Sequence, residues 1–228
     1  MNTYDFASYN ITTLGLGGII YNMNTYVFLT FVIFFVWFTY EIRKSSKKGH
    51  ESNKSFWERE READNVRKQP LDDLAYIEIP FDSLPLQVLA EDERIAEYHE
   101  TLRSLAERPI VNLSCISNTD LKLKYGAPNI NILSRYDSAY TVLARTLQHW
   151  AEKLHKAGFT AEARDILEFA VETGTDIKGT YVLLAEIYIE EGAPEKIAGL
   201  IAEAEGHNSS LSKGIVKKLK EMAEAGAP

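Results

Sequence analysis

Two stretches in the C-terminal half of the chain repeat each other at an offset of 34 residues. Residues 147–158 read LQHWAEKLHKAG, and residues 181–192 read YVLLAEIYIEEG. A fixed period of this size is typical of stacked helix pairs, because each pair buries its apolar face only against its neighbours. The matched positions are Trp150 with Leu184, Ala151 with Ala185, Leu154 with Tyr188, Gly158 with Gly192, Ala163 with Ile197, Leu167 with Ile201 and Ala170 with Ala204. The repeat therefore predicts a helical fold for this half.

The spacing of these residues resembles the tetratricopeptide repeat family over about residues 140–226. That family places small residues where two helices touch, large residues around them and a glycine at the turn within each helix pair. The chain departs from the pattern where Thr175 and Ser209 replace the proline that usually ends a repeat, and where Ile197 replaces a small residue. The resemblance implies a short α-helical solenoid, so the predicted fold class is mainly all-α.

A third unit at the C-terminus is incomplete. A further offset of 34 residues leads to Gly226, and residues 215–225 (IVKKLKEMAEA) supply one helical segment before it. Lys218 stands where the family has an apolar residue. This departure is suited to a terminal cap with one solvated face. We therefore assign residues 136–228 to two helical repeats and a C-terminal cap helix.

The resemblance also implies a partner site. In this family the first helix of each pair lines a concave groove for a peptide or a partner helix. By register, the residues in those positions are Arg145, Gln148, Glu152, His155, Val182, Glu186 and Ile189. The Lys and Asn with which one family variant binds a C-terminal carboxylate are replaced here by Gln148 and Glu152. We predict a protein or peptide partner, with no cofactor and no metal.

The charge of the chain restricts its partners further. Lys and Arg total 25 against 33 Asp and Glu, which gives a net charge of −8. This balance argues against nucleic acid, which would require a basic face. Residues 161–206 carry eleven acidic residues against three basic ones, Arg164, Lys178 and Lys196. This acidity either favours a basic partner or serves solubility alone.

No charged residue occurs between Asp5 and Glu41. The apolar stretch at 19–40 has 22 residues, enough for about 33 Å of helix against a hydrocarbon core of about 30 Å. Tyr and Trp residues near both ends resemble the aromatic belts of membrane interfaces. A cleaved signal peptide would need a basic start and a small-residue cleavage site, and the sequence has neither. We predict a transmembrane helix over residues 19–41.

The flanking charges predict the orientation of this helix. Residues 1–18 contain no Lys or Arg, whereas Arg43, Lys44, Lys47 and Lys48 follow the apolar stretch directly. The positive-inside rule then makes residues 1–18 an extracytoplasmic tail. The single Cys fits a reducing compartment for the rest. We expect a single-pass protein of the cell membrane with its N-terminus outside and its C-terminus in the cytoplasm.

Residues 42–69 are predicted to be a basic and charged linker. A helix is expected at 56–68, where charged residues are spaced for i,i+3 and i,i+4 pairs. This helix either lies on the membrane or packs against the body of the protein.

Residues 70–135 form a mixed middle region. The segment at 74–80 (LAYIEIP) alternates like one short strand or an extended crossing segment. Apolar spacing predicts a helix at 91–107, and a second is expected at 118–125. With the start of a long helix at 136–157, they are expected to cover the first repeat, because about three units are normally needed for a stable stack.

Support for catalysis is weak. His149 and His155 are six residues apart and face different sides of a helix, so they do not form an i,i+4 metal pair. Cys115 lies in the apolar run NLSCI and is predicted to be a buried structural thiol. We therefore predict that the protein is not an enzyme.

These features predict a membrane-anchored adaptor that presents the repeat domain to the cytoplasm. The alternative is an accessory or regulatory subunit of a membrane enzyme or transport complex, whose aromatic helix packs against another span. An enzyme that uses residues 70–135 is the third class, and it would have a deep polar pocket there.

Overall fold

The structure is a computed structural model, and it describes residues 27–42, 55–206 and 211–225. The chain divides into two compact units, Met1–Arg61 and Glu62–Pro228. The described residues are mainly helical, as predicted. Within these ranges the β-structure is limited to a single isolated bridge.

The aromatic segment of the first unit forms a helix at residues 27–42, all of which are exposed. A helix of these 16 residues is about 24 Å long, shorter than a hydrocarbon core of about 30 Å. No helix within the described ranges is long and apolar enough to cross a membrane. The predicted transmembrane helix over 19–41 is therefore wrong for the part of the chain that the structure describes. The predicted tail at 1–18 and the basic residues at 43–48 lie outside that part.

Residues 55–64 are helical, so the helix predicted at 56–68 is present but shorter. Ala63 near its end is fully buried. Asp64 forms an ion pair with Lys122, with Oδ1 and Nζ 2.7 Å apart. Ala63 and Asp64 belong to the second unit, so these contacts lie within that unit.

Residues 74–80 cross the second unit as an extended segment rather than as a strand of a sheet. Tyr76 pairs with Val111 in one antiparallel bridge. Next to it, the N–H of Ile77 donates a hydrogen bond to the carbonyl of Ile110 at 2.9 Å. The sequence allowed either one short strand or an extended crossing segment here, and the chain forms the crossing segment.

Two helices of the middle region confirm the predicted ones. α2 (Glu93–Ala106) corresponds to the segment at 91–107, and α3 (Asn118–Tyr125) to the segment at 118–125. α2 buries its apolar face in the main core, together with α4 to α8. α3 belongs to a smaller apolar cluster around the N-terminal end of α4.

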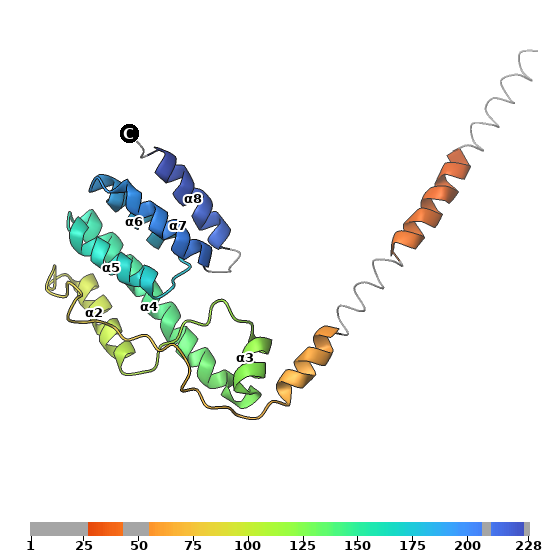
Figure 1. The fold of residues 1–228 in the computed structure, drawn as a ribbon, viewed down its shortest axis with the longest axis horizontal. Helices are drawn as coiled ribbons and strands as arrows, with labels where there is room; N and C mark the ends of the chain where they lie inside the picture. The colour runs from red at the N-terminus through yellow and green to blue at the C-terminus, as the bar shows by residue number, and fades with distance from the viewer. Residues whose placement is uncertain (1–26, 43–54, 207–210, 226–228) are drawn as a thin grey trace, which may run out of the picture. The chain divides into compact units, whose positions relative to one another are not determined.

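The remaining helices follow in order, and each packs against the next (Figure 1). They are α4 (Ile130–Lys156), α5 (Thr160–Glu172), α6 (Lys178–Glu190), α7 (Ile197–Gly206) and α8 (Ser212–Ala225), with the short turns η1 (Ala127–Asn129) and η2 (Pro194–Lys196) before α4 and α7. α6 also contacts both α4 and α8. α4 begins at Ile130 instead of residue 136, because η1 leads directly into it.

Small and large side chains alternate in the core between these helices. Ala151 of α4, Ala163 and Ala170 of α5, and Ala185 of α6 are fully buried, and so is Trp150. An alanine adds only a methyl group to the helix surface, so neighbouring helices approach closely while large side chains fill the remaining space. The small residues of the 34-residue pattern therefore lie in the core, as predicted.

The turn after α4 has the same hydrogen bonds as the turn after α6. Both turns contain a glycine with a left-handed backbone, Gly158 with φ +89° and Gly192 with φ +73°. The backbone N–H after each glycine bonds back into the helix, from Phe159 to Leu154 at 3.0 Å and from Ala193 to Tyr188 at 2.8 Å. These are Schellman motifs, in which glycine is favoured because it has no Cβ.

α2 packs against the C-terminal half of α4. Asp92 caps the first turn of α2, because its side chain accepts hydrogen bonds from two backbone N–H groups. Lys153 Nζ of α4 lies 2.7 Å from Asp92 Oδ1, and its hydrogen bond lowers the pKa of the Asp92 carboxyl. Further along α2, the ring of His99 packs edge-on against Trp150 with the ring centres 4.9 Å apart.

His99 is a buried, neutral member of this contact. It is 4% exposed, and its Nε2 has no hydrogen-bond partner among the described residues. Burial lowers the pKa of the imidazole below its ordinary value of 6.5, and the charge of Arg103 acts in the same direction. The unfolded chain therefore binds a proton on His99 at a higher pH than the folded chain does.

Replacing Gly192 with Ala should lower the free energy of unfolding by about 1–2 kcal/mol, because an L-residue in a left-handed backbone carries strain of that order. A Cβ at Gly192 meets no atom within 4 Å, so the loss reports the backbone alone. Gly199→Ala is the matched control, since its Cβ also meets no atom. It lies inside α7, where Ala is preferred by about 0.5–1 kcal/mol. Urea denaturation of the full-length chain measures both; equal effects would contradict the role of the turn.

Folding stability should fall as the pH drops below about 6.5, because only the unfolded chain then protonates His99 readily. Above that pH the imidazole is neutral in both states and adds no pH dependence. His99→Leu should flatten the fall between pH 6.5 and 5, as measured by thermal denaturation at several pH values. His149→Gln, at an exposed position of α4, is the control and should leave the profile as it is. Identical profiles for wild type and His99→Leu would show that His99 is not held neutral.

Candidate functional site

A shallow groove of about 300 Å³ lies between α4 and α6. Its lining residues are Gln148, Glu152, His155 and Lys156 of α4, and Gly179, Val182, Leu183 and Glu186 of α6. Five of the seven residues predicted to contact a partner are in this set. The first helices of the two repeats therefore bring these five side chains together at one surface.

Arg145 and Ile189, the other two predicted residues, are not among the residues that line this groove. Arg145 is exposed on α4. Ile189 is half-buried and packs against the main apolar core. The periodic register placed both residues on the first helices, but it did not resolve where the groove ends.

Gln148 is buried at the base of the groove, with only 5% exposed. Its Oε1 accepts a hydrogen bond from the buried hydroxyl of Thr180 at 2.6 Å, and its Nε2 donates to Glu152 Oε1 at 2.6 Å. The amide therefore links α4 to α6 instead of projecting towards a partner. The sequence register could not show this link, because Thr180 lies 32 residues away.

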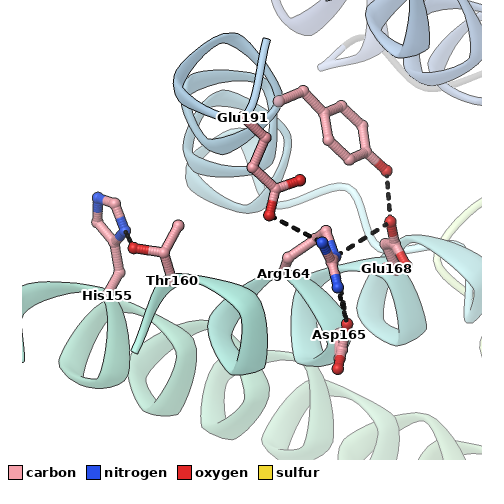
Figure 2. A network of polar contacts seen from close by, with 7 residues as sticks. His155, Thr160, Arg164, Asp165, Glu168 and Glu191 are labelled. Carbon is pink, nitrogen blue, oxygen red and sulfur yellow. Dashed lines mark hydrogen bonds and ion pairs between the residues drawn. The ribbon is translucent and has the colours of Figure 1, made fainter. Parts of the chain in front are cut away.

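His155 lies at the end of the groove, where α4 turns into α5. Its Nδ1 is 3.5 Å from Thr160 Oγ1 at the start of α5 (Figure 2). Its Nε2 is 4.0 Å from Glu190 Oε1 of α6. On the α4 side, Glu152 Oε2 is 3.7 Å from Nδ1 of the exposed His149. Each of these two imidazoles therefore has a carboxylate oxygen within 4.0 Å, although only His155 lines the groove.

The groove combines negative charge with a small apolar surface. Glu152 and Glu186 line it beside a single Lys, Lys156. Val182 and Leu183 are half-buried and supply the apolar part. A chain segment with one apolar and one basic side chain would complement this surface.

A second polar cluster, which the sequence analysis missed, surrounds Arg164 of α5 (Figure 2). The guanidinium contacts Asp165 through Nη2 at 2.9 Å and Glu191, beyond the end of α6, through Nη1 at 2.8 Å. These hydrogen bonds raise the pKa of Arg164. Glu168 Oε1 lies 3.9 Å from Arg164 Nε and accepts a hydrogen bond from the Tyr188 hydroxyl at 2.8 Å. The cluster joins α5 to α6 outside the groove.

One part of the Arg164 cluster was visible in the sequence. Arg164 and Glu168 have i,i+4 spacing, which predicts a contact on a helix surface. Glu191 lies 27 residues from Arg164, so its contribution depends on the packing of α6 against α5. Three carboxylates around one guanidinium leave the cluster acidic, in agreement with the acidity of residues 161–206.

The described residues show no arrangement typical of a metal centre. No group of three or more His, Cys, Asp or Glu side chains among them is placed to hold a metal ion. The prediction that Cys115 is buried is wrong, because its side chain is exposed. The run NLSCI enters an exposed loop at residues 114–117 before α3, so its apolar composition did not indicate burial.

Comparisons of the chain with protein-family models, with curated proteins and with solved structures find no match.

Gln148→Leu should lower the free energy of unfolding by about 1–3 kcal/mol, because it leaves the buried Thr180 hydroxyl without a partner. Thr180→Val should also destabilise the protein, since Gln148 Oε1 then lacks its donor. The double variant should cost less than the sum of the two single variants, because neither group is left unpaired. Urea denaturation of the four proteins in this cycle gives the coupling free energy. Simple additivity would contradict the link between α4 and α6.

Proposed function

We propose that the helices α4 to α8 form a short repeat domain of the tetratricopeptide type, which binds a segment of another protein in the groove between α4 and α6. The bound segment presents an apolar side chain to Val182 and Leu183 and a basic side chain to Glu152 and Glu186. The observation that carries this proposal is that five of the seven residues that the family resemblance assigned to a partner site line one groove.

Two features support the repeat type. The 34-residue period recurs in the hydrogen bonds of the Gly158 and Gly192 turns. The helices also pack in chain order, with α6 in contact with α4 before it and α8 after it. A stack of this kind leaves the first helices of successive pairs side by side, which is how a groove forms between them.

The electrostatics support a basic segment rather than an acidic one. Acidic side chains outnumber basic ones around the groove and over residues 161–206. Such a surface attracts positive segments over a distance of about one Debye length, roughly 8–10 Å at physiological salt. It also repels acidic competitors, so charge gives this site much of its selectivity.

Selection of a phage-displayed library of random 12-residue peptides on the full-length chain tests this function. Peptides with Lys or Arg close to an apolar residue should be enriched. Glu186→Lys should weaken their binding about tenfold, because it removes a rim charge pair worth ~1 kcal/mol and adds repulsion. Val182→Asp should weaken it by a similar factor through the apolar contact. Fluorescence anisotropy of labelled peptides measures both effects.

Glu172→Lys is the matched control, because Glu172 is exposed at the end of α5 and does not line the groove. It makes the same change in net charge as Glu186→Lys and should leave peptide affinity within about twofold of the wild type. Equal losses from the two charge reversals would mean that the peptides bind by general charge alone. Peptides insensitive to Glu186→Lys and Val182→Asp would overturn this site, and a selection without enrichment would overturn the function.

A further inference from the structure

A second and larger groove, of about 1180 Å³, lies between α2 and α4. It shares no lining residue with the groove between α4 and α6. One wall runs from Glu97 on α2 to Arg108, just beyond the end of that helix. The other wall is the N-terminal half of α4, from Ile132 to Val142. The proposed function makes no use of this surface.

The two walls run in opposite directions. Asp92 at the start of α2 contacts Lys153, and His99 contacts Trp150, so residue numbers fall along α4 as they rise along α2. The C-terminal end of α2 is therefore level with the middle of α4. The first turns of α4 continue past that end and lengthen the groove.

The floor of this groove is apolar. Leu105 of α2 and Ala139 of α4 are buried, whereas Val142 is 43% exposed. Ile132 and Tyr136 continue the apolar surface along α4 at helical spacing. This stripe covers eleven residues, from Ile132 to Val142, and its ends are about 15 Å apart along α4, which matches about three turns of an added helix. The exposed side of Val142, next to the buried Leu105 and Ala139, leaves an apolar surface on the floor of the groove.

The charged side chains of the groove are separated along its length. Glu97 and Glu100 lie on α2, whereas Arg108 and Arg135 lie towards the other end. Glu97 already pairs with Arg94 at 2.9 Å, so Glu100 carries most of the negative charge at its end. An occupant complements both ends only if it carries a basic residue at one end and an acidic residue at the other.

The walls also determine the backbone conformation of the occupant. Both are helices, whose backbone N–H and C=O groups are bonded within the helix and offer no edge to an extended peptide. An amphipathic helix needs no such edge, because it buries an apolar stripe between two helices by side-chain packing alone.

We propose that the groove between α2 and α4 binds one amphipathic helix of a partner protein. The helix is about three turns long, with an apolar stripe over Leu105, Ala139 and Val142. A basic side chain at one end faces Glu100, and an acidic side chain at the other end faces Arg135. The proposal concerns a second surface and does not depend on the function of the first.

Three synthetic 14-residue peptides test this site. All share one leucine stripe in an alanine background, and they differ only in their end charges. Peptide EK has Glu near its N-terminus and Lys near its C-terminus, the order that supports a helix. Peptide KK has Lys at both ends, and peptide EE has Glu at both ends. Fluorescence anisotropy with the full-length chain should show EK binding about tenfold more tightly than KK or EE, because each of those leaves one end mismatched.

Charge reversal in the protein should change this order. The double variant Glu97→Lys/Glu100→Lys should bind EE best, and the double variant Arg108→Glu/Arg135→Glu should bind KK best, because each reverses both charges at one end of the groove. Val142→Glu should weaken EK at least tenfold, because it places a charge on the apolar floor. Ile116→Glu is the matched control, since Ile116 is 41% exposed and lies outside the groove. It should leave the affinity for EK unchanged.

Two other results would overturn the proposal. The first is an affinity for EK that neither Val142→Glu nor the charge reversals change. Undetectable binding of EK at millimolar peptide would overturn the proposal in the same way. The second is a concentration-dependent dimer in analytical ultracentrifugation that Val142→Glu abolishes, because the occupant would then be a second copy of this chain. Glu186→Lys should leave EK binding unchanged, so failure here is distinct from failure of the α4–α6 groove.

Discussion

The rest of the second unit depends on the packing of α4, which contacts α2, α3, α5 and α6. Trp150 and Lys153 contact α2, whereas Gln148 bonds to Thr180 of α6. A helix of 27 residues cannot bury all its sides in a single hairpin. Its N-terminal half lines the groove beside α2, and its C-terminal half lines the groove beside α6.

The sequence predicted the helices of the repeat region well, because two local signals agree there. Apolar residues at helical spacing define the helices, and glycines such as Gly158 and Gly192 define where they turn. Segments without a period were less predictable. The boundary of α4 depends on η1, and the exposure of Cys115 depends on a loop. The transmembrane helix predicted over residues 19–41 was wrong, because no helix among the described residues is long and apolar enough to cross a membrane.

The sites were predictable only in part, because a register assigns a side chain to a face and not to a contact. Five residues of the α4–α6 groove were identified in this way, yet Gln148 among them bonds to Thr180 in the core. The links from Arg164 to Glu191 and from Lys153 to Asp92 join distant parts of the chain. They depend on tertiary packing, which no pattern of 34 residues contains. The groove beside α2 was missed for the same reason.

The identity of the two glycine turns has a consequence for how such a domain changes size. Because both turns use the same backbone bonds, a duplicated hairpin would keep the same connection between its own two helices. The connection between successive hairpins is a different turn, around Gly174. An added unit would therefore need that turn as well, together with apolar faces that fit its neighbours.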